Sequence, residues 1–557
     1  MKKYILLTLT IYFLLPGISQ TKYPKDFFIS PVEFKMAIAG TFGELRSNHF
    51  HSGIDIKTKQ KKNIPIYASQ SGYISRIKVS THGFGKAIYI NHPNGFTTVY
   101  AHLENFEKKI EDRTQTEQYK KESFEIDFSL NNTDIQVEKG DVIGFSGNTG
   151  SSTAPHLHFE IRETKTQKII NPMLFGLPIL DRTNPIINSI LIYHDNGKKE
   201  MIKTRKIDDH EYQLLYTPNI TGPFNIGVNT YDLLDAAPNK NGVYAIELYI
   251  NDSLHFANYM NQFAFSETRY INSHIDYEYH KNTGLKFQKC FLDINNHIST
   301  NQKYTTEKIG SNTNKKKQQI KLIIKDSYGN HALLEFNTEL HKKEIDQSNK
   351  QKNITEGKLI NCKQVFEFKD THFEIYLPNN SLYKDYIFKY SKRDDPTMTY
   401  PIYQILDDSI PSHKSFVIAI KENALPIELR KKALIGRLIN EEIHCLKSRW
   451  KENSIIGKSN KFGEFTIVID TIKPKIEYKK NYITDNQIQF KISDELSGIK
   501  EYRGEINGEW ILMEYDFKTD ILKYIFREEP SNKTHQINVS VTDYTDNTES
   551  ININFVR

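Results

Sequence analysis

The sequence has 557 residues and a formal net charge of +6, with 38% hydrophobic and 25% charged residues. This length exceeds one compact core and indicates three or four domains. The composition argues against both a disordered chain and a membrane protein, and the small, dispersed positive charge does not indicate nucleic-acid binding. The 32 tyrosines and 32 phenylalanines favour a mainly β fold.

The first residues have the layout of a secretory signal peptide, which we expect over 1–19. Lys2 and Lys3 precede an apolar run at 4–15, and Pro16 and the small residues Gly17 and Ser19 follow. The alternative, a membrane anchor, is disfavoured because the run is shorter than the roughly 20 residues that span a bilayer. We therefore expect an exported protein with no membrane span after signal cleavage.

From residue 23 to 180 the chain reads as short antiparallel strands separated by glycine turns. The expected strands are 64–68, 72–79, 87–91, 97–102, 142–146 and 156–162. The sequence Pro-Asn-Gly at 93–95 predicts a hairpin turn. The charged stretch between Glu104 and Gln136 breaks this pattern, and we interpret it as an insertion, 105–135, with a short helix and a loop.

Beyond residue 180 the β-like runs continue and predict small β-sandwich modules, with the immunoglobulin-like class as the default. The expected units are a β-sandwich region at 181–345, a β-rich domain at 355–470 and an immunoglobulin-like sandwich at 471–557. A faint repeat places an Asp and a Pro before a strand in DRTNP, from 181, and DTIKP, from 470. A second repeat is a strand followed by Asp and Asn: Asp232 with Asn239, Asp326 with Asn330, and Asp543 with Asn547.

The three cysteines, Cys290, Cys362 and Cys445, are far apart and outside any CxxC spacing. They predict neither a thiolate zinc site nor a disulfide framework, and at most one disulfide could form.

Two histidine segments are candidates for metal binding. His51 and Asp55 lie four apart, with Ser52 and Gly53 between them making a regular helix unfavourable, and imidazole and carboxylate are both ordinary zinc ligands. In the second segment two histidines lie two apart in an expected strand, so their side chains share a face and can converge on one ion or substrate.

These two histidines are His156 and His158, and a surface strand with two exposed histidines is the competing interpretation. His102 ends another expected strand and taken alone would be a structural histidine.

Five blocks in order resemble the lysostaphin/LytM-type cell-wall metallopeptidases over about residues 40 to 172. The blocks are His51-Ser-Gly-Ile-Asp55, Pro65-Ile-Tyr-Ala68 with Gly72, Tyr100-Ala-His102-Leu, Gly140-Asp-Val-Ile-Gly144 with Gly147 to Gly150, and His156-Leu-His158-Phe-Glu. The resemblance implies an antiparallel β metallopeptidase domain at 24–180. Where the family has a glycine two before the proline, this chain has Asn63, which also accepts a left-handed conformation.

The resemblance implies one Zn²⁺ per chain, with His51, Asp55 and His158 as ligands and His102 and His156 as catalytic residues that do not bind the metal. Three ligands leave a fourth position open for water, as a catalytic zinc site requires. One histidine would serve as general base and the other would stabilise the oxyanion, and the residues leave open which does which.

The implied function is a secreted zinc endopeptidase that hydrolyses peptide cross-links of peptidoglycan with a metal-activated water, in the periplasm, the envelope or outside the cell. The expected partners are peptidoglycan peptides and, through the C-terminal β modules, other envelope proteins. The alternative is a non-catalytic envelope scaffold or regulator that binds cell wall or a partner. A surface adhesin built on the β modules is a third hypothesis.

Overall fold

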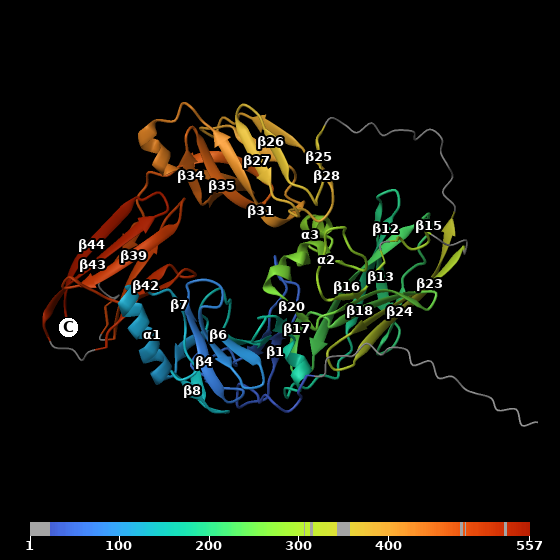
Figure 1. Ribbon diagram of the computed structural model, residues 1–557, viewed down its shortest axis with the longest axis horizontal. Helices are drawn as coiled ribbons and strands as arrows, with labels where there is room; N and C mark the ends of the chain where they lie inside the picture. The colour runs from blue at the N-terminus through green and yellow to red at the C-terminus, as the bar shows by residue number, and fades with distance from the viewer. Residues whose placement is uncertain are drawn as a thin grey trace, which may run out of the picture.

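The computed structural model describes residues 23–305, 307–311, 316–341, 357–479, 483–484, 486–527 and 532–557. The expected signal peptide, 1–19, lies outside these residues. The described chain is mainly β, as the sequence predicts, and its strands form four successive units (Figure 1).

The first unit is a largely antiparallel sheet with the order β1-β2-β10-β6-β5-β4-β7. Its strands are β1 (Ile38–Gly40), β2 (Ile54–Lys57), β3 (Pro65–Tyr67), β4 (Gly72–Val79), β5 (Lys86–Asn91), β6 (Phe96–Phe106), β7 (Ile126–Ser129), β8 (Gln136–Val137), β9 (Val142–Ser146), β10 (His156–Glu163) and β11 (Ile169–Ile170). The expected turn at 93–95 joins β5 to β6, with Gly95 at a φ of +83°. Alternating apolar residues from these strands build one buried core.

The charged stretch after Glu104 forms the expected helix, α1 (Lys108–Lys121), whose first turn is capped by the Glu107 carboxylate. The part expected as a loop differs, because Ile126–Ser129 forms strand β7 and pairs with β4. Ile126 and Leu130 are buried, so this segment adds an edge strand to the sheet.

The second unit has strands β12 to β24, and its order is β17-β16-β12-β13-β14-β24-β23-β18-β19-β22. The bounds are β12 (Ile186–His194), β13 (Lys199–Lys206), β14 (Glu211–Leu214), β15 (Ile220–Thr221), β16 (Phe224–Leu234), β17 (Ala237–Asn241), β18 (Ala245–Ile250), β19 (Ser253–Tyr259), β20 (Gln262–Phe263), β21 (Gln288–Lys289), β22 (Asn301–Lys303), β23 (Lys317–Lys325) and β24 (His331–His341). Short helices α2 (Ile271–His274) and α3 (Tyr277–Thr283) follow β20.

The third and fourth units each place two larger antiparallel sheets around one apolar core, and the third has an additional two-stranded sheet, β25-β28. The third has β25 (Leu359–Ile360), β26 (Phe366–Lys369), β27 (Phe373–Leu377), β28 (Tyr386–Ile387), β29 (Tyr390–Arg393), β30 (Ile402–Ile405), β31 (Pro411–Lys421), β32 (Ala433–Ile439), β33 (Glu442–Leu446), β34 (Ser448–Lys451), β35 (Ser454–Lys461) and β36 (Gly463–Ile469). The fourth has β37 (Lys475–Glu477), β38 (Gln487–Ser493), β39 (Ile499–Ile506), β40 (Glu509–Trp510), β41 (Met513–Asp516), β42 (Ile521–Ile525), β43 (Thr534–Asp543) and β44 (Thr548–Val556).

The four units follow one another around a ring, and the fourth returns to α1 of the first (Figure 1). Strand β20 extends the first sheet by pairing with β11, which joins the first and second units. Arg269 donates to the carbonyl of Ser412 at 2.6 Å between the second and third units. Lys432 donates to the carbonyl of Thr545 at 2.9 Å between the third and fourth.

The ring closes through contacts between residues far apart in the sequence. Lys86 of the first unit pairs with Glu514 of the fourth at 3.3 Å, and the rings of Tyr119 and Trp510 meet edge to face at 5.2 Å. The sequence repeats gave no indication of this closure, because none of its contacts follows from a local pattern.

Cys290, Cys362 and Cys445 are all free thiols, which agrees with the absence of a predicted disulfide framework. Among the described residues, no helix combines the length and apolar character needed to cross a bilayer.

Candidate metal centre

The candidate metal ligands come from neighbouring strands of the first sheet. Asp55 lies on β2 and His158 on β10, and the two are paired in the antiparallel register. His51 precedes β2 in a segment that is not helical, as the Ser-Gly pair predicts. Directly paired residues on neighbouring strands share a face, so Asp55 and His158 lie side by side.

Three atoms converge to form the centre of the site. His51 Nε2 lies 2.9 Å from Asp55 Oδ1 and 3.1 Å from His158 Nδ1, and the latter two atoms are 3.0 Å apart. All three residues are buried. In a tetrahedral zinc site with bonds of about 2.0–2.1 Å, ligand atoms are separated by roughly 3.3 Å, close to the spacing of this triangle.

The outward contacts of the two imidazoles determine which ring nitrogens carry lone pairs. His51 Nδ1 faces the carbonyl oxygen of Thr41 at 2.8 Å and therefore carries the hydrogen. His158 Nε2 faces a carboxylate oxygen of Glu160 at 3.0 Å and likewise donates. The inward nitrogens can thus both offer lone pairs, facing each other and a carboxylate. Burial lowers the pKa of His158, but Asp55 and Glu160 outweigh it and raise the pKa to about 9, so a proton lies between these atoms when no metal is bound. A metal ion would take the place of that proton, and the donor set fits one.

Charged neighbours support the two carboxylates around His158. Arg46 Nη2 donates to Asp55 Oδ2 at 2.7 Å, which leaves Oδ1 for the centre. Arg162 donates to Glu160 Oε2 at 2.7 Å. Burial opposes ionisation of Glu160, but Arg162 and His158 offset it and lower its pKa to about 2. Glu160 is therefore an ionised acceptor for the His158 N–H.

His102 and His156 lie beside the centre. Their ring centroids are 4.9 Å apart, and that of His102 is 5.8 Å from that of His158. His102 Nδ1 faces the carbonyl of Thr149 at 2.9 Å, and His156 Nε2 lies 3.4 Å from Asp55 Oδ1. Burial, together with His158 and His156, lowers the pKa of His102 to about 3.

Backbone conformation explains how His102 reaches the centre. Ala101, its predecessor on β6, pairs with His158, so regular alternation would send His102 to the opposite face. His102 instead adopts a left-handed φ of +63°, at an irregularity where β6 passes from β5 to β9. This uncommon conformation for a residue other than glycine turns the ring toward the site.

The structure therefore brings all five predicted site residues together, while their chemical roles stay predictions. Sequence analysis did not assign Arg46, Glu160 or Arg162. A signal for two of them was present, because the polar residues His156, His158, Glu160 and Arg162 alternate along an otherwise apolar strand. Asn63 has a φ of +64°, as predicted for the position where the family has glycine.

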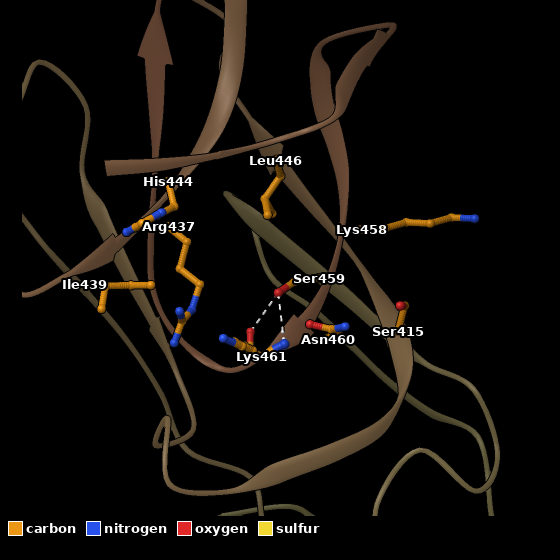
Figure 2. Close-up of a pocket in the computed structure, with 9 residues that line it drawn as sticks. All are labelled: Ser415, Arg437, Ile439, His444, Leu446, Lys458, Ser459, Asn460 and Lys461. Atoms are coloured by element: carbon orange, nitrogen blue, oxygen red, sulfur yellow. Dashed lines mark hydrogen bonds between the residues drawn. The ribbon is translucent and has the colours of Figure 1, made fainter. Parts of the chain in front are cut away.

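A separate cavity lies in the third unit, away from the candidate metal centre, with a volume of about 350 Å³. Figure 2 shows its lining, which includes the cations Arg437, Lys458 and Lys461. Arg437 is held by the carbonyl of Phe462, and Ser459 and Lys461 bond to each other. The lining itself contains no carboxylate; the acidic groups nearby are Asp408, 3.8 Å from Arg437, and Glu442, 3.7 Å from His444.

Two protein-family models match parts of the chain. Residues 49–119 and 126–172 match the model of Peptidase family M23, and residues 357–470 match that of the Zu5-like domain. The chain thus carries an M23, LytM-type, peptidase domain, as the resemblance predicts.

The relatives match about a quarter to a third of the chain. The DD-carboxypeptidase/endopeptidase Mpg of Neisseria meningitidis serogroup B is 34% identical over 25% of this chain and 26% of its own length. Peptidoglycan DD-endopeptidase ShyC of Vibrio cholerae serotype O1 is 27% identical over 34% of this chain and 38% of its own. The catalytic domain of lysostaphin from Staphylococcus simulans is 24% identical, with a TM-score of 0.20, over 25% of this chain and 92% of that domain. The chain spans about a quarter of the length of the curated relatives that match first.

Proposed function

We propose that this chain is a zinc-dependent endopeptidase that hydrolyses peptide cross-links of bacterial peptidoglycan. The observation that carries the proposal is the triangle of His51 Nε2, Asp55 Oδ1 and His158 Nδ1, three buried acceptors within 3.1 Å of one another. The M23 match supports the reaction class. Relatives named as peptidoglycan endopeptidases support the substrate class.

In this proposal His51, Asp55 and His158 hold one zinc ion. When bound, zinc would supply a Lewis acid for the scissile carbonyl and lower the pKa of water toward neutrality. Glu160 fixes the His158 ring so that Nδ1 keeps its lone pair, and Arg46 occupies the second oxygen of Asp55. These outward contacts hold the three proposed ligand atoms, His51 Nε2, Asp55 Oδ1 and His158 Nδ1, in place.

In this proposal the two remaining histidines, His102 and His156, take part in proton transfer. The N–H of His102 Nδ1 donates to the Thr149 carbonyl, so its lone pair is on Nε2, and its low pKa keeps the ring neutral at physiological pH. We assign His102 as the acceptor of the attacking water's proton. His156 Nδ1 faces the carbonyl of Ala154 at 2.8 Å, so the ring needs a second proton, on Nε2, to stabilise charge on the carbonyl oxygen. The proton that His102 takes from the water then passes to the leaving amine.

The protein would work outside the cytoplasm, because its substrate lies there and its first residues have the layout of a signal peptide. We further propose that the units after residue 180 position the peptidase domain or bind other envelope proteins.

The test uses the purified chain loaded with zinc and incubated with isolated cell walls, and identifies the released muropeptides by mass. We expect release to stop with a chelator and with His158→Ala, which should also lose its zinc. His102→Ala should retain one zinc but turn over about 10²–10⁴ times more slowly. The exposed His372→Ala is the matched control. A folded, zinc-loaded wild type that releases nothing would exclude the peptidase and favour the non-catalytic scaffold.

A further inference from the structure

Three aspartates meet at the junction of the first and second units, away from the candidate zinc centre. Asp181 precedes β12, Asp232 lies on β16, and Asp326 directly follows β23. One oxygen from each lies within 4.8 Å of the other two. The three residues are only 8%, 2% and 3% exposed, respectively, so water does not screen their carboxylates effectively.

Charge is poorly compensated within this cluster. In the described part of the chain, no lysine, arginine or histidine forms an ion pair with Asp181, Asp232 or Asp326. Only Asp326 has several donors, because its Oδ1 accepts the N–H groups of Tyr328, Gly329 and Asn330. Buried carboxylates that repel one another need either protons or a cation.

Unpartnered buried oxygens point to a cation. Asp232 Oδ1 and Asp181 Oδ2 lie out of solvent without a hydrogen-bond partner. The same holds for the amide oxygen of Asn241, a residue that is 3% exposed. Asn241 is the register partner of Asp232 on β17, and paired residues share a face. An uncharged oxygen that can bind a metal ion therefore lies alongside the carboxylates. Buried oxygens almost always have a hydrogen-bond partner, so unpartnered ones point to a ligand.

We propose that Asp181, Asp232, Asp326 and Asn241 form a binding site for a calcium ion. Calcium takes oxygen ligands at about 2.3–2.6 Å, so oxygens on opposite sides of the ion are about 5 Å apart, which fits this cluster. Zinc favours nitrogen and sulfur, and magnesium retains several waters in a smaller octahedron. A buried set of carboxylate and amide oxygens matches calcium better than either.

The ion would stiffen the junction between the two units. Tyr328, two residues after Asp326, packs against the core of the first unit with Leu234 of β16. Ser327 accepts a hydrogen bond from Asn171 of the first unit at 3.3 Å. A cation holding Asp181 to β16 and β23 would therefore fix the point where the chain leaves the peptidase domain.

The fourth unit offers a matched control, because Asp470, Asp494 and Asp543 repeat the same layout. Their oxygens accept backbone N–H groups, including those of Ser497, Gly498 and Asn547, as Asp326 does in the first cluster. The two clusters differ in their unpartnered oxygens. Among the described residues, none of the buried unpartnered oxygens belongs to this second cluster. We interpret it as a hydrogen-bonded turn rather than a site.

The experiment titrates calcium chloride into the zinc-loaded full chain by calorimetry and follows thermal melting with and without calcium. We expect one site, a calcium-dependent rise in melting temperature, and a loss of at least tenfold in affinity with Asp232→Asn. Asp494→Asn should bind like wild type. Without calcium, Asp232→Asn should melt no lower than wild type, because it removes a buried charge; a purely structural aspartate would not show this reversal.

Asn241→Ala, which removes a neutral ligand, provides a second variant should Asp232→Asn fail to fold, and should weaken binding several-fold. The proposal is overturned if folded wild type gives no calcium binding, or if Asp232→Asn or Asn241→Ala binds as well as wild type. Equal loss in Asp494→Asn would also overturn the assignment to this junction.

Discussion

Glu160 is the residue that prepares His158 for metal binding, although it does not lie among the proposed ligands. Its Oε1 accepts from His158 Nε2, and Arg162 satisfies Oε2. The carboxylate is fully buried, so its position is fixed by these contacts. A carboxylate that accepts from a ligand histidine orients the ring and raises its basicity.

We therefore expect Glu160→Gln to weaken zinc binding by about 10–100-fold, because the amide is a weaker acceptor and can present an N–H to His158 instead. Competition with a chromophoric chelator measures this. Glu163→Gln, at the exposed end of the same strand, is the control and should leave the affinity unchanged. Equal affinities in wild type and Glu160→Gln would show that the carboxylate has no part in metal binding.

The approach of two elements sets the geometry of the centre. Gly53, between His51 and Asp55, faces β10 so closely that a Cβ atom there would lie 2.3 Å from the carbonyl oxygen of Phe159. The β10 backbone could not move aside to make room for such a Cβ atom, as the end of a flexible side chain could. The glycine therefore allows the segment from His51 to Asp55 to lie against the strand that carries His158.

Gly53→Ala should destabilise the protein by about 1–3 kcal/mol and lower zinc affinity, because it forces the two elements apart. Thermal unfolding and zinc competition measure the two effects. Gly95→Ala is the comparison, since Gly95 has a φ of +83° and open space around it. It should cost stability through strain without changing zinc affinity. A Gly53→Ala variant with unchanged zinc affinity would contradict this account.

Elements also explain what could be predicted from the sequence. Period-two alternation and glycine turns located β4, β9 and β10, and the His-x-His spacing placed His156 and His158 on one face. The left-handed turn at His102 could not be predicted, because it breaks the alternation that defines a strand. Arg46 and Thr41 reach the centre from irregular segments before β2, where no period relates sequence to position.

At the scale of the whole molecule, the contact between the first and fourth units depends on ionised side chains. Burial opposes ionisation of Glu514, but Lys86 and Lys523 offset it and lower the pKa of Glu514. Burial likewise opposes the charge on Lys86, and Glu514 with other carboxylates offsets it and raises the pKa of Lys86. Each group is therefore more favourably charged in the folded ring than in the unfolded chain.

The sign of the pH dependence follows. Glu514 contributes to folding stability above its ordinary pKa of about 4.3, and this contribution is lost as the pH falls through the lowered pKa. Lys86 contributes to folding stability below its ordinary pKa of about 10.4, and this contribution is lost as the pH rises through the raised pKa. The contact should thus be strongest from about pH 5 to 10. Fluorescence of Trp510, which meets Tyr119 across this contact, should change on acidification before the far-ultraviolet circular dichroism does.

This experiment uses a Trp450→Phe background, which removes the other tryptophan, so that the fluorescence comes from Trp510 alone. Glu514→Gln should abolish this early acid change, since it removes the carboxylate that pairs directly with Lys86. If the change persists in Glu514→Gln, a different group controls the contact.

Because the four units form a closed ring, the contact between the first and fourth units needs only weak attraction to stay formed. Lys86 and Glu514 are 428 positions apart. Two separate proteins would have to give up independent translation and rotation to form such a contact, which costs several kcal/mol. Here three packed joints already hold the partners near each other, so their effective concentration is high. The ion pair of Lys86 and the packing of Leu512 in the core of the first unit therefore need to add little to keep the ring closed. Expressed apart, the same two surfaces should not associate at cellular concentrations.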